Sequence, residues 1–244
     1  TFIFFIGYID DYKNLKPSSK TLLLILVLFF SILFDKNLII NELYFSFTEY
    51  KFWLGKFAIF FTICSIFLFI NAFNLFDGID LQAGTYSLFI IAYLFFITGF
   101  NNIFIPFFLF ILFFLLLNYK KEIFLGDAGS LLISFILSYF IIKTFNKNEN
   151  LIFCDQIFII MMLPGIEMLR LFISRIYKKR NPFKPDRNHL HHVLSSKQNQ
   201  YFAFYIISLL YTMPVVMIIL GISTVLILFI FLIFYIFLLN YKFR

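Results

Sequence analysis

Residues 103–119 read Ile-Phe-Ile-Pro-Phe-Phe-Leu-Phe-Ile-Leu-Phe-Phe-Leu-Leu-Leu-Asn-Tyr, a stretch without a single charged side chain. The run is continuous and does not alternate with a period of two, so it is typical of a membrane-spanning helix rather than of a strand in a transmembrane β-barrel. Seven further apolar runs lie at residues 21–34, 53–70, 86–100, 131–145, 152–174, 202–220 and 222–239. The expected fold is therefore an all-α, polytopic transmembrane bundle of about eight helices.

The composition of the whole chain agrees with this expectation. Hydrophobic residues make up 62% of the 244 positions and charged residues 14%, whereas soluble domains have about 45–50% and about 25%. The mean hydropathy is +0.94. Cys64 and Cys154 both lie in apolar runs, so we expect buried thiols without a disulfide framework or a cysteine-based metal site. Because no repeat or linker-like stretch interrupts the chain, residues 1–244 are expected to form a single domain.

The apolar run at the N-terminus extends only from Thr1 to Ile9. A helix needs about 20 residues to cross a bilayer, so this run is too short to do so. No charged segment precedes it, which argues against a signal peptide. We expect it to be the remainder of a transmembrane helix, in a domain that lacks its N-terminal spans.

Basic residues are distributed unequally between the two sides of the expected bundle. When the loops are assigned to alternate sides, 14 Lys and Arg fall on one side and 5 on the other, while Arg170 lies within a span. The richer side contains residues 10–20, 71–85, 118–130, 175–200 and the C-terminal tail. Basic residues accumulate on the cytoplasmic side of membranes, so we expect this side to face the cytoplasm. Four polar clusters lie on it.

Two of these clusters carry carboxylates at short spacing. Asp10 and Asp11 end the first apolar run, where they repel each other unless a cation or a proton intervenes. A solvated helix end is the alternative interpretation. The second cluster has four oxygen-bearing side chains at intervals of three residues: Asn71, Asn74, Asp77 and Asp80. On a helix or 3₁₀ turn these lie along one face and suit a hard cation such as Mg²⁺, the alternative being a polar seam between helices.

The other two clusters suit anion binding. Residues 126–130, Gly-Asp-Ala-Gly-Ser, precede a span, where Asp127 can cap the helix and the helix N-terminus can attract phosphate. Capping alone would also explain this pattern. All three histidines lie within four positions: His189, His191 and His192. Zinc is the rival interpretation, but no cysteine is nearby and the spacing does not match separated ligand pairs. With Lys184 and Arg187, we interpret the imidazoles as an anion-binding loop.

Taken together, the four clusters resemble the motifs of the polyprenyl-phosphate N-acetylhexosamine-1-phosphate transferases, integral membrane enzymes that begin bacterial glycan assembly. The matching segments are Asp10-Asp11 with Lys20, Asn71 to Asp80, Gly126 to Ser130, and Pro185 to His192. Their order and spacing agree over essentially the whole chain. The His-Leu-His-His arrangement is closer to the N-acetylglucosamine-phosphate branch of the family than to the phospho-MurNAc-pentapeptide translocases.

The resemblance implies transfer of N-acetylhexosamine 1-phosphate from a UDP-sugar to polyprenyl phosphate, such as undecaprenyl phosphate, with release of UMP. This is the first membrane step of cell-envelope glycan synthesis, for O-antigen or a wall polymer, with the active site on the cytoplasmic face of the bacterial inner membrane. The implied cofactor is Mg²⁺, with Mn²⁺ as the alternative. No nucleic acid is expected as a partner, and a homodimer is considered.

The resemblance also implies a role for individual residues. The implied metal ligands are Asn74 and Asp127. The implied catalytic residues are Asp10, Asp11 and Asp77. The implied substrate-binding residues are Lys20, Asn71, Asp80, Arg187, His189, His191 and His192.

Two other classes of function fit parts of the sequence. Polar residues inside membranes mark ion paths in transporters, but here the carboxylates gather at one face and no inverted repeat is visible. An inactive, truncated relative that serves as a structural subunit is the other alternative. Release of UMP from a UDP-sugar by membranes that contain the protein would separate the transferase from the transporter.

Overall fold

The computed structural model of the protein describes residues 2–99, 102–147, 151–179, 181, 188–197 and 199–240. The chain begins with α1 (Phe2–Lys13), α2 (Pro17–Phe34), η1 (Lys36–Leu38), β1 (Glu42–Tyr44), β2 (Lys51–Trp53) and η2 (Gly55–Phe57). It continues with α3 (Ala58–Phe76), α4 (Gln82–Thr98), η3 (Asn102–Phe104), α5 (Ile105–Tyr119) and α6 (Gly126–Lys147). It ends with α7 (Cys154–Tyr177), α8 (Leu190–Lys197), α9 (Gln200–Ile219) and α10 (Thr224–Asn240). The expected all-α bundle is confirmed, with a small β-hairpin that the apolar runs did not predict.

The predicted spans coincide with helices α2, α3, α4, α5, α6, α7, α9 and α10. Within the described ranges, six helical stretches are long and apolar enough to cross a membrane. Helices α4 and α10 are shorter apolar helices of 17 residues each. All eight predicted positions are therefore helical, and six of them also have the length that a bilayer requires.

The outer faces of the helices carry large apolar side chains that point away from the bundle. Leu22, Phe34, Phe113 and Phe229 are each at least 60% exposed. Exposing such an apolar surface to water is unfavourable, whereas contact with the hydrocarbon of a bilayer is not. Together with the length of the helices, this surface identifies a multi-pass membrane protein.

Helix α6 is the most buried of the candidate spans, and α2 is the least buried. Ser130, Ser134 and Ser138 lie four residues apart on one buried face of α6. The hydroxyls of Ser134 and Ser138 donate to carbonyl oxygens one turn earlier, at 2.7 and 2.8 Å, so their polarity is satisfied within the helix. Small side chains let neighbouring backbones approach closely, and both α1 and α3 pack against α6.

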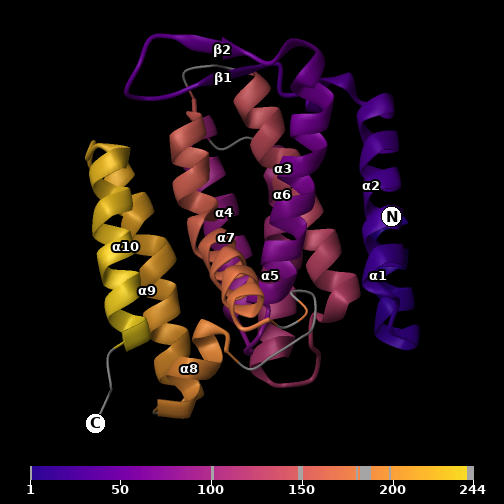
Figure 1. The fold of residues 1–244 in the computed structure, drawn as a ribbon, viewed down its shortest axis with the longest axis vertical. Coiled ribbons are helices and arrows are strands. Elements are labelled where there is room, and N and C mark those ends of the chain that lie inside the picture. Colours follow the sequence, from indigo (N-terminus) through magenta and orange to yellow (C-terminus); the bar gives the residue numbers. More distant parts are fainter. Residues whose placement is uncertain are drawn as a thin grey trace.

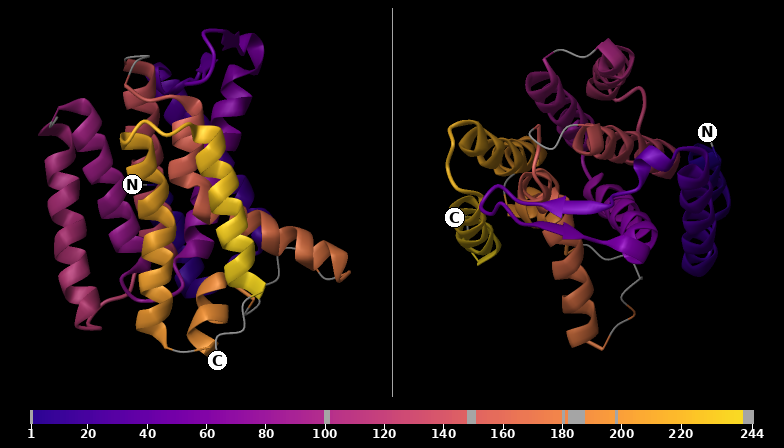
Figure 2. Two further views of the ribbon diagram at one scale, coloured as in Figure 1. Left: turned by 90° about the vertical axis from the view of Figure 1, so that its left-hand side faces the viewer. Right: turned by 90° about the horizontal axis from the view of Figure 1, so that it is seen from above.

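The helix ends that carry the polar clusters lie together. In Figure 1 the α1–α2 turn, the α3–α4 loop, the α5–α6 loop and α8 lie at the lower end of the bundle, and the β-hairpin lies at the upper end. The second half of α7, which follows Pro164, leans away from the bundle on the lower side (Figure 2). We refer to the lower end as the site end and to the upper end as the hairpin end.

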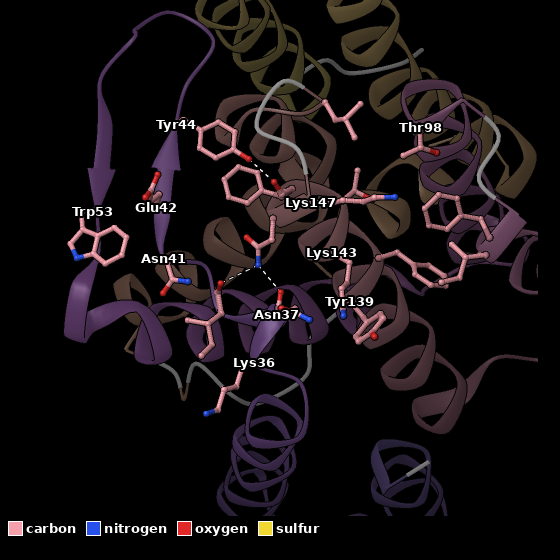
Figure 3. A pocket seen from close by; sticks show the side chains of 18 residues that line it. Lys36, Asn37, Asn41, Glu42, Tyr44, Trp53, Thr98, Tyr139, Lys143 and Lys147 are labelled. Atoms are coloured by element: carbon pink, nitrogen blue, oxygen red, sulfur yellow. Dashed lines mark hydrogen bonds between the residues drawn. The ribbon is translucent and has the colours of Figure 1, made fainter.

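A cavity of about 760 Å³ opens at the hairpin end, between the loop after α2 and the end of α6 (Figure 3). Three lysines line it: Lys36, Lys143 and Lys147. The Lys143 ammonium pairs with Asp35 Oδ2 at 2.6 Å, and the amines of the three lysines point in different directions. No predicted site residue among those that the structure describes lines this cavity. This cavity is therefore not the predicted active site.

The fold predicts that Ser196 in α8 and Glu49 in the hairpin lie on opposite sides of the membrane. Single cysteines at these positions, in a background without Cys64 and Cys154, should react differently with a membrane-impermeant thiol reagent in intact cells. The charge distribution predicts labelling at position 49 and protection at position 196 until the cells are permeabilised. Labelling of both positions without permeabilisation would contradict the topology.

Candidate active site

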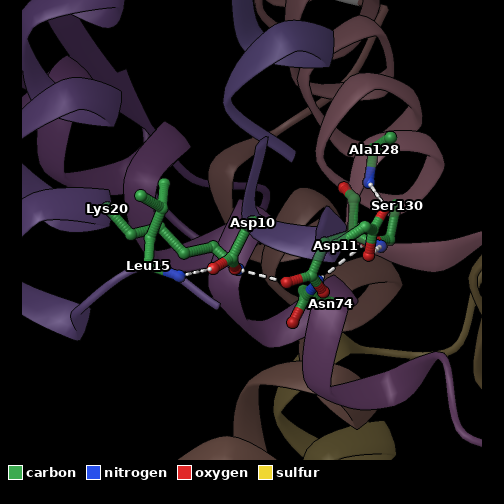
Figure 4. A network of polar contacts seen from close by, with 8 residues as sticks. Asp10, Asp11, Leu15, Lys20, Asn74, Ala128 and Ser130 are labelled. Carbon is green, nitrogen blue, oxygen red and sulfur yellow. Dashed lines mark hydrogen bonds and ion pairs between the residues drawn. The ribbon is translucent and has the colours of Figure 1, made fainter. Parts of the chain in front are cut away.

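The ammonium group of Lys20 lies between two carboxylates at the site end (Figure 4). Its Nζ is 2.7 Å from Asp10 Oδ2 and 2.7 Å from Asp127 Oδ2. Asp10 is buried, and its Oδ1 accepts a hydrogen bond from the backbone N–H of Leu15 at 2.7 Å. Two carboxylates held this close need a cation between them to remain charged. Because the three side chains come from α1, α2 and α6, one cation joins three helices.

Asp11 binds the beginning of α6. Its Oδ1 accepts from the backbone N–H of Asp127 at 2.8 Å, and its Oδ2 accepts from that of Ala128 at 3.0 Å. The first N–H groups of a helix lack partners within the helix and carry partial positive charge, so a carboxylate stabilises them. The interpretation of Asp127 as the cap of this helix is therefore wrong. The cap comes from Asp11 on another helix, and the Asp127 carboxylate turns toward Lys20.

Asn74, near the end of α3, completes this group of polar contacts. Its Nδ2 donates to Asp127 Oδ1 at 2.6 Å and to Ser130 Oγ at 2.8 Å. A half-turn of the amide would present its oxygen beside the Asp127 carboxylate, and oxygen ligands of this kind fit Mg²⁺ or Mn²⁺ better than Zn²⁺. Across the described residues, no three His, Cys, Asp or Glu side chains are grouped closely enough to hold a metal. A metal here would therefore also need amide or substrate oxygens as ligands.

Gly7 allows α1 to approach α6 closely enough for these contacts. A Cβ atom at this position would lie 2.5 Å from the Cα of Ala128 and 2.5 Å from the carbonyl oxygen of Asp127. Both are backbone atoms at the start of α6, which cannot move aside as the tip of a flexible side chain does. The placement of Asp10 and Asp11 therefore depends on the absence of a side chain one turn earlier.

Asp77 lies just beyond α3, in the loop that leads to α4. Burial, together with the negative charges of Asp127 and Asp80, raises the pKa of Asp77 from 3.8 to about 7. A bound cation would favour the ionised form and lower this pKa. Asp77 is therefore a carboxylate whose charge near neutral pH depends on what binds beside it.

A cavity of about 280 Å³ borders this loop. It is lined by Asp77, Asp80 and neighbouring loop residues on one side, and by Phe124, Leu125 and Gly126 on the other. The same cavity is therefore bounded by the second and third sequence clusters. Because Gly126 directly precedes Asp127, this cavity lies beside the polar contacts and could hold part of a substrate.

His191, in the first turn of α8, approaches the same loop, and His189 directly precedes this helix. His189 and His191 are buried, and the ring centroids of the two lie 5.2 Å apart. A Cβ atom on Gly78 would lie 2.0 Å from Cε1 of His191, so the imidazole covers this glycine. Burial and the neighbouring imidazoles lower the pKa of His191 to about 3. His191 is therefore neutral at pH 7 and can offer a hydrogen bond to an anion, but not a positive charge.

Two predicted site residues form their hydrogen bonds outside this group of polar contacts. The Asn71 amide donates to the carbonyl oxygen of Phe67 in its own helix at 2.7 Å. Asp80 Oδ2 accepts from Gln200 Nε2 at the start of α9, at 3.3 Å. Arg187, together with Lys184, lies outside the described residues. The structure thus groups Asp10, Lys20, Asn74 and Asp127 tightly, with Asp77 and His191 beside them.

Sequence reasoning missed two polar groups that support the site. Asn118, at the end of α5, accepts the N–H of Leu81 through Oδ1 at 2.7 Å and donates to the carbonyl oxygen of Ile123 at 2.8 Å. It thereby connects the two loops that border the smaller cavity. Glu167 and Arg170 form an ion pair within α7, with 2.6 Å between Oε1 and Nη2. The sequence contained a signal for this pair, because Arg170 lies within an apolar span three residues after Glu167 and a charge in such a span needs a partner.

Comparison with known proteins agrees with the motifs. Residues 1–145 match the model of glycosyl transferase family 4. This match covers more than half of the chain, and the chain belongs to that family. The expected family is therefore confirmed.

The chain is also similar to bacterial proteins named undecaprenyl-phosphate alpha-N-acetylglucosaminyl 1-phosphate transferase. It is 29% identical over 203 residues to the one from Escherichia coli K12, and 27% identical over 208 residues to the one from Yersinia pestis. Each comparison covers 78% of this chain, and 54% and 55% of the two relatives. The Haemophilus influenzae protein is 37% identical over 76 residues, 31% of this chain and 21% of that relative. The chain thus spans about half the length of the first two relatives.

Replacing Gly7 by alanine should destabilise the protein, because its Cβ would overlap the backbone of α6. Gly165→Ala is the matched control, since a Cβ at that helical position meets no atom within 4 Å. We expect Gly7→Ala to lower the free energy of unfolding by about 1–3 kcal/mol, and Gly165→Ala to leave it unchanged or raise it by up to about 1 kcal/mol. Thermal unfolding in detergent measures both. Equal stability of the two variants would contradict the close approach of α1 to α6.

The raised pKa of Asp77 predicts how stability depends on pH when metal is removed. As the pH rises from 3.8 toward about 7, the unfolded chain loses this proton while the folded chain keeps it, so stability falls across that window and then levels off. Asp77→Asn removes this pH-dependent loss of stability, because asparagine does not ionise. In EDTA the variant should be more stable than the natural protein at about pH 8, and the difference should shrink at about pH 4. A difference that is the same at both pH values would show that Asp77 ionises normally.

Proposed function

We propose that this protein transfers N-acetylhexosamine 1-phosphate from a UDP-sugar to polyprenyl phosphate, and that UMP is released. The observation that carries the proposal is the convergence of Asp10, Lys20, Asn74 and Asp127 at one end of a membrane bundle. These residues come from four helices, and each belongs to a motif of the resembled transferases. The names of the relatives specify undecaprenyl phosphate and an N-acetylglucosaminyl 1-phosphate group, which we propose as the acceptor and the transferred group here.

In the proposed reaction, an oxygen of the lipid phosphate attacks the β-phosphorus of the UDP-sugar. A new P–O–P bond forms to the lipid, the bond between the β-phosphorus and the bridging oxygen breaks, and UMP leaves with that oxygen. Both reactants are anions, so the protein has to offset charge and hold the two phosphates in line. The excess of basic residues at the site end supports a cytoplasmic site, where nucleotide sugars are available, in the bacterial inner membrane.

The polar contacts suggest how the residues share this work. Lys20 is the cation at the centre, and we propose that it binds the lipid phosphate while Asp10 orients it. Asp11 holds the start of α6, and through it the position of Asp127. The smaller cavity beside Asp80, with the histidines of α8, would receive the UDP-sugar. Such a charged site at the end of a bundle lets the polyprenyl tail remain in the membrane.

Asn74 and Asp127, with Asp77 nearby, would hold Mg²⁺. Their oxygens form the kind of donor set that this cation prefers, and a buried Asp77 gains its charge most readily beside a cation. When bound, Mg²⁺ supplies positive charge to the diphosphate oxygens. We propose this cofactor on the chemistry of these side chains, with Mn²⁺ as the alternative.

The position of one labelled phosphorus atom tests the reaction. Membranes from cells that express the protein are incubated with UDP-N-acetylglucosamine labelled with ³²P at the β-phosphate, with and without added undecaprenyl phosphate. We expect the label to enter the lipid and UMP to be released in equal amount. A glycosyl transfer would leave the label in UDP. A transporter or an inactive relative would release no UMP, and either outcome would contradict the proposal.

The roles of two carboxylates can be separated by their response to Mg²⁺. Asp127→Asn keeps an oxygen but loses the charge that would hold the metal, so raising Mg²⁺ should restore part of the lost UMP release. Asp11→Asn loosens the start of α6 without removing a ligand, and should reduce turnover about 10- to 100-fold. Added Mg²⁺ should not restore it. If both variants recover equally, the two residues share one metal site and the capping role of Asp11 is insufficient.

A further inference from the structure

Three polar side chains form a closed group at the site end, away from the carboxylates of the proposed reaction; two of them are buried and the third, an arginine, is half-buried. Glu167 and Arg170 lie on α7, just after Pro164, and Tyr235 lies on α10. The Arg170 guanidinium donates to both Glu167 oxygens, at 2.6 and 3.1 Å, and to the hydroxyl oxygen of Tyr235 at 2.9 Å. The Tyr235 hydroxyl in turn donates to Glu167 Oε2. We call these three residues the clamp.

The clamp also binds the backbone that leads into α8. Glu167 Oε1 accepts the N–H of Leu190 at 2.7 Å, and Arg170 Nη2 donates to the carbonyl oxygen of Asn188 at 2.6 Å. Glu167 thus accepts a hydrogen bond from one backbone N–H group, and Arg170 donates one to a backbone carbonyl group. The residue between the two contacts is His189. The clamp therefore fixes the backbone on both sides of the first histidine.

An ion pair that served only to neutralise Arg170 would not need these contacts. A charged side chain in a membrane span is costly, and Glu167 alone would reduce that cost. Here the carboxylate accepts four hydrogen bonds, and one of them comes from a segment 23 residues later in the chain. Arg170 Nη2 donates to that segment as well. Both charged side chains therefore contact the backbone that leads into α8.

The position of that segment decides where the histidines lie. Two residues after His189, the ring of His191 covers Gly78 in the loop between Asp77 and Asp80. A displacement of α8 by about 1 Å would change this contact, and misplacement on that scale can cost about a hundredfold in rate. The chain of contacts runs from α10 through α7 to the histidines, and from them to the loop beside the smaller cavity.

We propose that Glu167, Arg170 and Tyr235 are positioning residues, which hold residues 188–192 against Gly78 so that the histidines can bind the UDP-sugar donor. The clamp acts through the backbone of α8. This inference rests on the proposed function for the identity of the donor, but the positioning itself can be measured without turnover.

The first test uses the fact that the 244 residues contain three histidines, all of them in this segment. Diethyl pyrocarbonate, a histidine reagent, therefore reports on the clamp in the resting protein, and mass spectrometry separates the three sites. Tyr235→Phe removes one hydroxyl and keeps the ring. We expect the modification rates of His189 and His191 to rise about tenfold, the factor expected for a lost hydrogen bond to a charged group. Half-buried His192 is the internal reference.

Tyr139→Phe is the matched control, because the hydroxyl of Tyr139 also donates to a carboxylate, Asp35 Oδ2 at 3.1 Å, but at the hairpin end. It should leave all three rates unchanged. Arg170→Lys is the second clamp variant: it keeps the charge but loses the planar fork that reaches Glu167 and Asn188 together. It should raise the rates as Tyr235→Phe does. Unchanged rates in both clamp variants would overturn the proposal.

The second test separates positioning from general stability. In the labelled-phosphate assay, Tyr235→Phe should raise the KM for UDP-N-acetylglucosamine about tenfold, with little change in the KM for undecaprenyl phosphate. A loss that falls equally on both substrates would contradict positioning of the donor. If the natural protein transfers no labelled phosphate, the proposed function fails, while the modification rates still decide whether the clamp holds α8.

Discussion

The shared Lys20 ammonium, 2.7 Å from both Asp10 and Asp127, is the interaction on which the site end depends. Each carboxylate is held by further hydrogen bonds, Asp10 by the N–H of Leu15 and Asp127 by Asn74. Without the cation, two negative charges would face each other at the edge of the hydrocarbon, where little water is present to separate them. The position of α1 relative to α6 therefore follows from charge balance as much as from apolar packing.

The same principle recurs at two other ion pairs of the bundle. Arg170 has Glu167 three residues earlier, and Lys143 has Asp35 at the hairpin end. Arg170 on α7 and Lys143 on α6 both lie on helices that are long and apolar enough to span a membrane. Such pairs add little net stability, because removing two charges from water is costly. The Lys143–Asp35 pair does restrict which helices can be neighbours, because it joins α6 to the end of α2 and an unpaired charge would be much less favourable than the pair.

The sequence was informative where the cause of a structure was local. Continuous apolar runs located the helices, and the resemblance to the transferases implied that Asn74 and Asp127 would lie close enough to share a ligand. The hairpin was missed because its strands have three residues each, too few to show an alternating pattern. The capping of α6 by Asp11 was missed because the partners are 116 residues apart. The hydrogen bond from Tyr235 to Glu167 likewise joins residues that are 68 positions apart, and no spacing rule predicts such a contact.

The contact between Gly78 and His191 constrains how these two positions can change during evolution. Any side chain at position 78 would place its Cβ within 2.0 Å of the imidazole, so the two residues cannot vary independently. Descendants of this chain that keep the ring in this place must keep the glycine, and those that gain a side chain at position 78 must lose the ring, turn it aside or shift α8. Substitutions at the two positions should therefore depend on each other, although five elements of the fold, from α4 to α7, separate them in the sequence.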